Sequence, residues 1–275
     1  MITASIVTYH TNPNEVIQLV SSLINNNVNH IYIIDNSSND LLRNYIAKFD
    51  QLTYIHSKNI GYGNAHNIAI KESFKLNNTY HIIVNPDIII PKNDTIDKLK
   101  KFMDSTTTCG LVMPLILYPN NEIQYLCKLL PSPKDLLIRR FLPSFLKNKN
   151  IDYKYELRYT KYNQVMEVPS LSGCFMFIRA DILKEIGGFD KRFFMYAEDL
   201  DLCRRIGRIS KTIFYPYTYV FHKYEKGSYK NFKLLKYHII SIIKYFNKWG
   251  WFFDKERKLT NQACIEKFKK TSLNK

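Results

Sequence analysis

The chain has 275 residues, of which 45% are hydrophobic, enough for one large α/β domain or two small ones, and this composition excludes a disordered or fibrous protein. No run of about 18 uncharged apolar residues is present, which argues against a membrane-spanning helix. The N-terminus lacks the basic and apolar regions of a secretory signal, and the five cysteines form no CxxC pair. We therefore expect the reduced thiols of a cytoplasmic protein, and neither a zinc site nor a disulfide framework.

The net charge of +16 is unevenly distributed along the chain. Residues 1–110 carry nine basic and nine acidic side chains, so the whole excess lies in residues 111–275. The last fifty residues alone hold 13 Lys or Arg against 3 Asp or Glu. This asymmetry predicts different functions for the two parts, and the basic part suits nucleic acid, an anionic membrane or a phosphorylated substrate.

The first 118 residues alternate strand and helix signals. Strands are expected at residues 4–9, 30–36, 52–57, 81–85 and 110–118. Helices are expected at residues 14–26, 40–49, 61–75 (after a glycine-bearing loop) and 92–103. The first helix has Val16, Leu19, Val20 and Leu23 at helical spacing. This order predicts an α/β fold with a doubly wound, Rossmann-like, mostly parallel sheet and helices on both faces.

The alternation stops near residue 119, and residues 120–168 indicate irregular helices and loops. Order returns with a strand, a short helix and a Gly-Gly turn in residues 172–190, a helix near 194–208, and two short strands within 212–222. The tail predicts one long helix with an apolar stripe of Phe232, Leu235, Ile239, Ile242, Phe246 and Trp249. Because lysines occupy the other side, this helix either lies on a membrane surface or packs its stripe on the core.

Four polar clusters follow the predicted parallel strands, at residues 8–10, 35–38, 59–67 and 85–87. Turn chemistry explains each one singly. Ligands bind beyond the carboxyl ends of parallel strands, so four such clusters together predict a nucleotide-sized crevice.

The cluster at residues 85–87 interrupts an apolar run, "HIIVNPDIIIP". Pro86 cannot donate a ladder hydrogen bond, and burying Asp87 without a partner would cost several kcal/mol. We therefore expect the strand to end at Val84, a tight polar turn to follow, and Asp87 to face the crevice.

Three carboxylates, Glu198, Asp199 and Asp201, lie within four residues at the start of a predicted helix. Acidic residues in a first helical turn are ordinary helix capping. Their mutual repulsion, however, favours a bound cation or a catalytic role, with one of them as a general base.

The ordered set "SIVTYH", "IIDNSS", "NIGYGNAHNIAI", "VNPDIII", "SGCFMFIRADILKEIGGFDKRFFMYAEDLDLCRRI" and "FHKYEKGSYKNFKLLKYHIISIIKYFNKWG" resembles family-2 glycosyltransferases of the GT-A fold, particularly the rhamnosyltransferase-like branch. The resemblance covers most of the chain. It implies a nucleotide-sugar-binding half at residues 1–118 and an acceptor-binding, catalytic half at 119–225. Residues 226–275 would then form a basic amphipathic helical tail.

The resemblance also implies a donor site in which Asp35 contacts the nucleotide base, with Thr8 and Tyr9 beside it. The expected donor-binding residues are Thr8, Tyr9, Asp35, Asn36, Asn59, Gly61, Asn67, Asn85 and Asp87. Asn85-Pro86-Asp87 replaces the family's D-x-D motif, so Asp87 is expected to hold Mg2+ or Mn2+ on the diphosphate. His222 matches a histidine that reaches the metal or the diphosphate, with a structural role as the alternative.

On the acceptor side the resemblance implicates Gly173, Cys174 and Glu198. Asp199 matches the general base that deprotonates the acceptor hydroxyl, and Glu198 orients it or touches the acceptor. Arg204 and Arg205 either pair with the diphosphate or form a solvated helix end.

The resulting hypothesis is an inverting, metal-dependent bacterial glycosyltransferase that uses dTDP-L-rhamnose. Its expected acceptor is a cell-surface polysaccharide, such as lipopolysaccharide or capsule, carried on polyprenyl diphosphate. The basic tail would hold it peripherally on the anionic cytoplasmic face of the membrane. Two alternatives concern the donor, which would be a UDP-hexose or a UDP-N-acetylhexosamine.

Two further alternatives belong to other classes. A nucleotidyltransferase would need a phosphate loop near the first strand, which "SIVTYHTNPNE" lacks. A nucleic-acid-binding protein would explain the charge, but no recognition motif is present, and we expect no nucleic-acid partner. No feature of the sequence indicates an oligomeric state.

Overall fold

The computed structural model describes residues 1–136, 149–223 and 232–273. Its first part contains strands β1 (Ile2–Thr8), β2 (His30–Asp35), β3 (Leu52–His56), β4 (Tyr80–Val84), β5 (Ile88–Ile89) and β6 (Cys109–Leu117). The helices between them are α1 (Pro13–Asn25), α2 (Leu42–Ile46), α3 (Tyr62–Ser73), the 3-10 turn η1 (Phe74–Leu76) and α4 (Thr95–Ser105). Each strand and helix predicted for this part is present, with β5 as an additional short strand.

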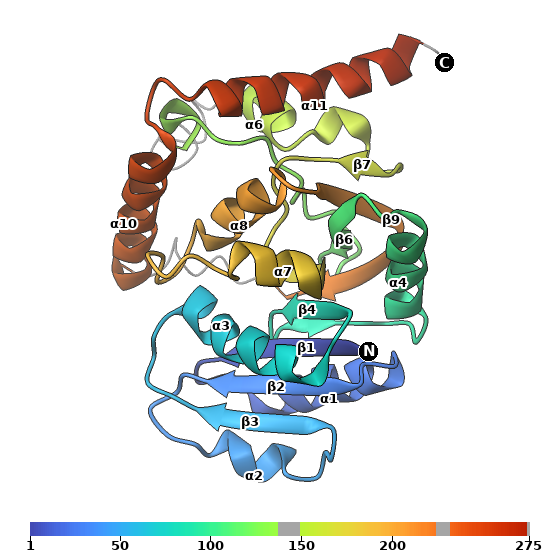
Figure 1. The fold of residues 1–275 in the computed structure, drawn as a ribbon, viewed down its shortest axis with the longest axis vertical. Helices are drawn as coiled ribbons and strands as arrows, with labels where there is room; N and C mark the ends of the chain where they lie inside the picture. Colours follow the sequence, from blue (N-terminus) through green and yellow to red (C-terminus); the bar gives the residue numbers. More distant parts are fainter. Residues whose placement is uncertain (137–148, 224–231, 274–275) are drawn as a thin grey trace.

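The second part contains α6 (Lys149–Tyr155), η3 (Arg158–Thr160), β7 (Met166–Glu167), β8 (Phe175–Arg179), α7 (Ala180–Ile186), α8 (Glu198–Ile206) and β9 (Lys211–His222). The tail contains α10 (Phe232–Trp249) and α11 (Lys255–Leu273). Figure 1 shows α10 standing at the side of the sheet and α11 crossing the end of the molecule opposite β3.

All strands join one mixed sheet in the order β3-β2-β1-β4-β8-β6-β9-β5, with β7 paired to β9. The pairs β1–β2, β2–β3 and β1–β4 are parallel, as predicted for a doubly wound α/β fold. β8 lies antiparallel between β4 and β6, so β6 does not extend the parallel series directly. The α/β fold prediction is confirmed, and the second half adds most of the antiparallel pairs.

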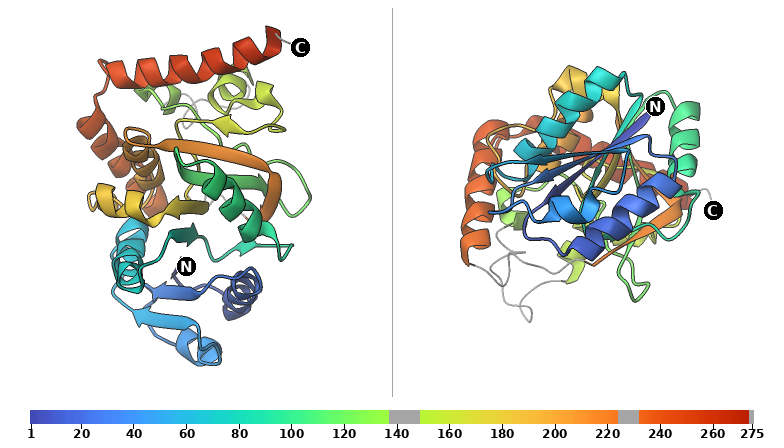
Figure 2. Two further views of the ribbon diagram at one scale, coloured as in Figure 1. Left: turned by 45° about the vertical axis from the view of Figure 1, so that its right-hand side comes forward. Right: turned by 90° about the horizontal axis from the view of Figure 1, so that it is seen from below.

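Helices cover both faces of the sheet, and α1 and α3 lie on opposite sides of it (Figure 2). The predicted apolar positions of α1, Val16, Leu19, Val20 and Leu23, are all buried, while Pro13 occupies the first turn where its missing N–H costs nothing. The central strands are fully buried on both faces, which is typical of parallel strands between helix layers.

Three sequence predictions are wrong in detail. The tail, expected as one long helix, forms the two helices α10 and α11, because the chain turns at Gly250, which has φ +99°. The two short strands expected within residues 212–222 form one strand, β9, whose register shifts where Pro114 and Leu115 pair with Tyr215 and Tyr219. The extra residues between these partners form a bulge, which lets a strand containing Pro216 stay continuous.

The predicted apolar stripe of α10 is only half correct. Ile242, Phe246 and Trp249 pack against Leu200 and its neighbours, whereas Phe232 and Ile239 are exposed. Within the described ranges, no helix is long and apolar enough to cross a membrane. The helical segments expected at 137–148, the "YEKGSYKN" part of the quoted motif and the boundary at 225/226 lie outside the described residues.

Candidate functional site at the carboxyl edge of the sheet

Strands β1, β2 and β4 end at the same edge of the sheet. Thr8, the last residue of β1, is in register with Asp35, the last residue of β2, and Ile6 is in register with Val84. Because these strands are parallel, the polar residues that follow them converge at one edge. The sequence predicted this convergence.

Asp35 is fixed by hydrogen bonds on both oxygens. Its Oδ1 accepts from the Ser37 backbone N–H (3.0 Å) and hydroxyl (2.5 Å), and Oδ2 accepts from the Tyr54 hydroxyl (2.7 Å). Burial, and then the contact with Asp35, raises the pKa of Tyr54 well above its ordinary value, so Tyr54 stays a donor. Asp35 is buried at this edge of the sheet, and its remaining lone pairs can accept further hydrogen bonds.

The neighbours of Asp35 differ in accessibility. Thr8 is buried, and its hydroxyl has no hydrogen-bond partner in the structure. Tyr9 is exposed and lies edge-on against His10, which has a left-handed backbone. Asn36 is buried and accepts from the Ser57 hydroxyl at 3.0 Å. A buried hydroxyl without a partner and an exposed aromatic ring beside it suit a ligand with polar and planar parts.

The glycine-bearing loop before α3 makes a close backbone approach. Gly61 has φ +90°, and a Cβ on it would lie 2.2 Å from the Phe194 carbonyl oxygen. The Tyr62 N–H donates to that same oxygen at 2.8 Å, and the side chain of the exposed Asn59 accepts from the Gly61 N–H. Gly61 therefore joins the donor half to the segment that precedes Glu198.

The Asn67 side-chain amide is bonded to the backbone of Phe189 and is not free to bind a ligand. Its Nδ2 donates to the Phe189 carbonyl and its Oδ1 accepts from the Phe189 N–H, both at 2.8 Å. This pair of bonds holds the loop after Gly188, where a Cβ would collide with the Asn67 side chain. Asn67 thus positions the loop of the second half.

The turn at Asn85-Pro86-Asp87 has the predicted form. β4 ends at Val84, Pro86 and Asp87 form a turn, and β5 begins at Ile88. The Asn85 N–H donates to the Cys174 carbonyl (2.9 Å), which ties the turn to β8. Pro86 therefore ends the strand without leaving a buried donor unpaired.

Tyr62, at the start of α3, links this turn to the acidic helix. Its hydroxyl lies 2.8 Å from Asn85 Oδ1 and 2.9 Å from the Gly173 carbonyl oxygen. Burial, and then the nearby acidic groups Glu198, Cys174, Asp199 and Asp87, raise the pKa of Tyr62 well above its ordinary value. Asp87 and the α8 acids Glu198 and Asp199 therefore lie around one tyrosine.

Asp87 faces His222 from the end of β9. His222 Nε2 lies 3.4 Å from Asp87 Oδ2, and Asp87 is the more accessible partner. Gln124 donates to the His222 carbonyl (2.7 Å), which leaves its Oε1 to accept from Nδ1 (3.0 Å). The Nδ1 proton is thus fixed, and Nε2 points at Asp87.

The pKa of His222 lies above its ordinary value, at about 10. Burial alone would lower it, but the neighbouring Cys174 thiol and the Asp87 carboxylate outweigh burial. Cys174 is buried immediately before β8, and its side chain is hydrogen-bonded to His222. This places the Cys174 side chain on the Asp87 side of the site, while its acceptor-side assignment stays a prediction.

The donor set at Asp87 fits a hard divalent cation that is shared with a diphosphate. Asp87 offers a carboxylate, His222 would offer Nε2 once a cation displaces its proton, and phosphate oxygens would supply the remaining ligands. In the part of the chain that the structure describes, no group of three or more His, Cys, Asp or Glu side chains forms a closed metal site. An ion here would therefore depend on the nucleotide for part of its coordination.

Asp199 lies in the first turn of α8 with both oxygens held. Oδ2 accepts from the Gly173 N–H (3.0 Å), and Oδ1 accepts from the Leu200 N–H (2.8 Å). A Cβ on Gly173 would lie 3.1 Å from the Asp199 Cβ, so this approach favours glycine. Asp199 is only partly buried, and its free lone pairs can accept a proton.

Glu198 has a different environment. It is buried, and its Oε2 has no hydrogen-bond partner. Burial, and then the charge of Asp199, raises the pKa of Glu198 to about 8. The two residues before it, Tyr196 and Ala197, both have left-handed backbones, φ 71° and 61°. Strained non-glycine residues next to a buried, unpaired acid are typical of functional sites.

The third acid and the two arginines do not belong to the crevice. Asp201 is fully buried and binds Arg205 (2.8 Å) and Lys248 (2.5 Å). Arg204 forms a buried bidentate pair with Asp254, at 2.7 and 2.6 Å. Both alternatives for the arginines, a diphosphate contact and a solvated helix end, are therefore wrong. Arg205 is instead bound by Asp201 of α8, and Arg204 by Asp254, which lies just before α11.

Helix α10 braces the segment that leads into Glu198. The Ser241 hydroxyl donates to the Met195 carbonyl (2.7 Å), and Lys244 donates to the Arg192 carbonyl (2.7 Å). Tyr237 stacks on Phe194 with ring centroids 4.5 Å apart. The tail thus helps to hold the segment that precedes Glu198, through contacts with backbone carbonyls that the sequence did not indicate.

Sequence reasoning missed Tyr62 and Gln124. The glycines on either side of Tyr62 indicate a close approach there, but its partners come from residues 23 and 111 positions away. Gln124 lies in a segment that looked irregular, 98 residues from His222. Both contacts depend on topology that local pattern does not contain.

Known proteins resemble this chain over most of its length. The family described as glycosyl transferase family 2 matches residues 4–187. The rhamnosyltransferase WbbL of Escherichia coli K12 is 26% identical over 223 residues, which cover 78% of this chain and 81% of that protein. The low-salt glycan biosynthesis hexosyltransferase Agl10 of Haloferax volcanii is 30% identical over 184 residues, covering 64% of this chain and 52% of that protein.

A third curated relative is the N-acetylglucosaminyl-diphospho-decaprenol L-rhamnosyltransferase of Mycobacterium tuberculosis. It is 28% identical over 179 residues, which cover 60% of this chain and 56% of that protein. The match thus spans only about half the length of two of these three relatives.

Solved structures share the fold. The mannosyltransferase PcManGT of Pyrobaculum calidifontis, in complex with GDP-Man and Mn2+, has a TM-score of 0.58 at 16% identity, covering 90% of this chain and 64% of that chain. TarS 1-349 of S. aureus has a TM-score of 0.54 at 13% identity, covering 90% of this chain and 65% of that chain. The family match covers well over half of the chain and the fold agrees, so this chain belongs to glycosyltransferase family 2, with the GT-A fold.

Proposed function

We propose that this glycosyltransferase moves L-rhamnose from dTDP-L-rhamnose to a hydroxyl of a lipid-linked or growing cell-surface glycan, with inversion at the anomeric carbon. The names of two relatives, both rhamnosyltransferases, support the sugar, and one of those names supports the lipid diphosphate acceptor. A UDP-hexose or UDP-N-acetylhexosamine donor in the same site is the second candidate, supported by the hexosyltransferase relative.

The observation that carries the proposal is the meeting of two acidic centres around Tyr62. Asp87 and Asp199 come from opposite halves of the chain, and both act on the pKa of the Tyr62 hydroxyl. Asn85 and Gly173, the neighbours of these acids, contact that hydroxyl directly. A donor diphosphate at Asp87 would therefore lie within one site with a base at Asp199.

Donor binding follows from the sheet edge. Asp35 would accept a hydrogen bond from the nucleoside, and the unpaired Thr8 hydroxyl would donate one to it. The Tyr9 ring would pack against the plane of the base. Asp87 and His222 would hold a Mg2+ or Mn2+ ion, which neutralises charge on the leaving diphosphate when it is bound.

Glu198 and Asp199, the first two acids of α8, would have different roles in the reaction. Glu198 keeps its proton up to about pH 8, so it is a poor base near neutrality and a good hydrogen-bond donor to the acceptor or to Asp199. Asp199, which is partly exposed and held by the Gly173 N–H, takes the proton of the acceptor hydroxyl. That oxygen bonds to the anomeric carbon as the bond to the diphosphate breaks, and general-base help is worth about 10²- to 10⁴-fold.

The acceptor assignment implies a membrane location. A polyprenyl-diphosphate-linked glycan stays in the bilayer, so the enzyme would work peripherally at the anionic cytoplasmic face. The strongly basic C-terminal part of the chain supports this location.

A donor panel tests the proposal. Transfer to an N-acetylglucosaminyl polyprenyl diphosphate is measured with dTDP-L-rhamnose, UDP-glucose, UDP-galactose and UDP-N-acetylglucosamine, each with Mg2+ or Mn2+. We expect the highest kcat/KM with dTDP-L-rhamnose and a product of inverted anomeric configuration. A UDP-sugar as the best donor would favour the second candidate, and a retained configuration would overturn the mechanism.

A further inference from the structure

Helix α10 is apolar on two sides: Tyr245 and Phe246 are buried against the protein, and a second apolar side faces outward. Its inward face uses Ser241, Lys244 and Lys248, which bind the segment 190–195 through hydrogen bonds and an ion pair. The large exposed apolar residues on its other side are Phe232, Ile239, Ile240 and Ile243. The outward side of an ordinary surface helix is polar, so exposed apolar residues on that side of α10 indicate an interaction site.

The loop after α10 extends this apolar face. Trp251 is 37% exposed, Phe252 is 78% exposed and Phe253 is fully exposed. Trp251 packs against Phe246 of α10, with ring centroids 5.1 Å apart, so the loop lies beside the helix. Two adjacent phenylalanines in water forgo the stabilisation that burial of their rings would give.

Both ends of this loop are anchored. Gly250, with φ +99°, donates to the Phe246 carbonyl at 2.8 Å and turns the chain away from the helix axis. On the far side, Asp254 is buried against Arg204, and Arg257 donates to the Trp251 carbonyl at 3.3 Å. Phe252 and Phe253 are therefore held outward by fixed flanks, and are not exposed by fraying.

The charges around this face favour an anionic partner. Residues 232–253 contain no Asp or Glu. Lys233 and Lys236 flank the apolar side of α10, and Lys255 and Lys258 follow the loop, all exposed. The two acids that follow the loop in sequence are already paired, Asp254 with Arg204, and Glu256 with Arg204 and Arg208.

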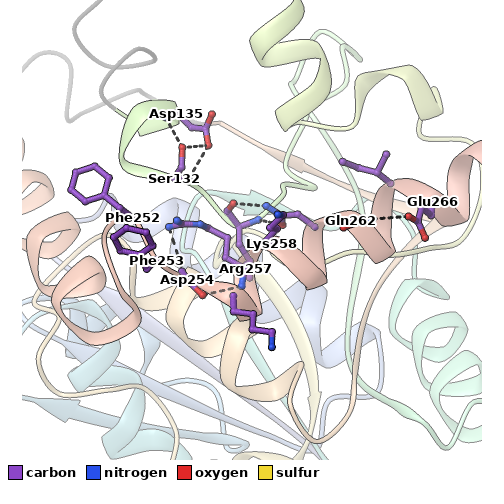
Figure 3. Close-up of a pocket in the computed structure, with 13 residues that line it drawn as sticks. Ser132, Asp135, Phe252, Phe253, Asp254, Arg257, Lys258, Gln262 and Glu266 are labelled. Atoms are coloured by element: carbon purple, nitrogen blue, oxygen red, sulfur yellow. Dashed lines mark hydrogen bonds and ion pairs between the residues drawn. The ribbon is translucent and has the colours of Figure 1, made fainter.

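A groove of about 850 Å³ adjoins the loop, as Figure 3 shows, with Phe252 and Phe253 at one end and Glu266 at the other. Most of its polar side chains are satisfied by one another. Asn261 bonds both the N–H and the carbonyl of Leu130, and Gln262 bonds Glu266. The groove therefore offers few unpaired groups to a small polar ligand, and the aromatic rim is its distinctive feature.

We propose that the outward face of α10 and the Trp251–Phe253 loop, together called the apolar face, dock on an anionic lipid bilayer. An amphipathic helix with lysines beside its apolar side binds such a surface by apolar insertion and electrostatic attraction together. Its biological purpose rests on the proposed lipid-linked acceptor. The other side of α10 braces the segment before Glu198, so docking would set the catalytic half directly against the bilayer.

Vesicle flotation tests the proposal with the full chain. Binding is compared on phosphatidylcholine vesicles and on vesicles with 30 mol% phosphatidylglycerol. The variants are Phe252→Ser with Phe253→Ser, and Ile239→Ser with Ile243→Ser. The matched control is Leu41→Ser with Tyr45→Ser, which removes two exposed apolar side chains at α2, at the opposite end of the molecule.

We expect wild type and the α2 control to float with the anionic vesicles and to bind neutral vesicles weakly. Each apolar-face variant should need at least about 10-fold more lipid for half binding, because it has less apolar surface to bury in the bilayer. Variants that bind like wild type, or an α2 control that loses binding equally, would overturn the proposal.

Two further measurements test whether the apolar face itself contacts the bilayer. Brominated phosphatidylglycerol should quench fluorescence in wild type but much less in Trp251→Phe, because Trp249 packs on Arg204 and Arg208. Sedimentation velocity compares wild type and the Phe252→Ser, Phe253→Ser variant without lipid. We expect no wild-type dimer that is lost in the variant. A dimer of that kind, without flotation, would instead make this face an interface between two copies and refute lipid docking.

Lipid binding and transfer can fail independently. An Asp199→Asn protein should float like wild type even though it is expected to be inactive. The Phe252→Ser, Phe253→Ser protein should retain transfer to a short, water-soluble acceptor and lose it only with vesicle-bound acceptor. Flotation without any sugar transfer would leave docking intact and overturn only the proposed function.

Discussion

The Tyr62 hydroxyl lies 2.8 Å from the Asn85 amide oxygen, which makes one side chain of α3 the link between the Asp87 turn and the acidic helix. The same hydroxyl is 2.9 Å from the Gly173 carbonyl, and the Gly173 N–H donates to Asp199. The turn at Asn85–Asp87 is thus connected to Asp199 through three hydrogen bonds and the backbone of Gly173. Tyr62 is a positioning residue in this account.

Replacing Tyr62 with Phe should lower kcat/KM about 10-fold, because two acceptors lose a shared donor at roughly 1–3 kcal/mol per buried unsatisfied group. The measurement is steady-state transfer together with thermal unfolding. Tyr80→Phe is the control, since it deletes a hydroxyl bonded to Asp104 outside the crevice. If both variants lose stability alike and neither loses kcat/KM, Tyr62 has only a structural role.

Glu198 should make stability depend on pH. Its pKa in the folded protein is about 8 against an ordinary value of 4.5, so the folded state holds a proton that the unfolded state releases between these values. The stability contributed by the protonated group is complete below about pH 4.5 and is lost as pH rises to about 8. This loss is on the order of a few kcal/mol.

Glu198→Gln removes this titration. The difference in Tm between Glu198→Gln and wild type should therefore grow in favour of the variant from pH 5 to pH 8 and then level off. Differential scanning calorimetry of both proteins without nucleotide or divalent metal measures it. A difference that stays constant across this range would show that Glu198 ionises normally in the folded protein.

The sequence predicted the sheet edge well because local pattern contains it. Apolar runs followed by polar turns located β1, β2 and β4, and Pro86 correctly indicated the end of a strand. Parallel pairing then brings Thr8, Asp35 and Asn85 to one edge. Each step depends on neighbours only a few residues apart, or on a general rule of topology.

Long-range partners were beyond reach of the sequence. Arg204 and Arg205 look like a solvated helix end until Asp254, 50 residues later, folds against the first of them. The polar contacts of α10 were also missed: Ser241 and Lys244 donate to the Met195 and Arg192 carbonyls, beside the part of the apolar stripe that is buried. Backbone acceptors leave no trace in hydrophobic periodicity.

Asp87 should determine how much divalent metal the enzyme needs. Asp87→Asn removes the only carboxylate in the donor set of Asp87 and His222, so the Mn2+ concentration for half-maximal transfer should rise more than about 10-fold. Titration of transfer with Mn2+ and with Mg2+ measures this. Asp97→Asn, an acidic residue of α4 that is not part of the crevice, is the control and should leave the titration unchanged.

Arg204 should support the tail more than Arg208 does. Arg204 is buried in a bidentate pair with Asp254, so Arg204→Ala strands a buried carboxylate and should cost about 3–5 kcal/mol in the free energy of unfolding. Arg208 pairs with Glu256 at an exposed position, where the loss should be about 1 kcal/mol or less. Urea unfolding of both variants gives the comparison, and equal losses would contradict the buried pair.

The most direct test of the account is the Asp199→Asn substitution. Asparagine keeps the size of the side chain and can still accept from the Gly173 N–H, but it cannot take the acceptor proton. Nucleotide-sugar binding is measured by calorimetry and transfer by single-turnover kinetics. We predict unchanged donor affinity and a transfer rate at least about 100-fold lower. Full transfer activity in Asp199→Asn would contradict the assignment of the base and, with it, the proposed mechanism.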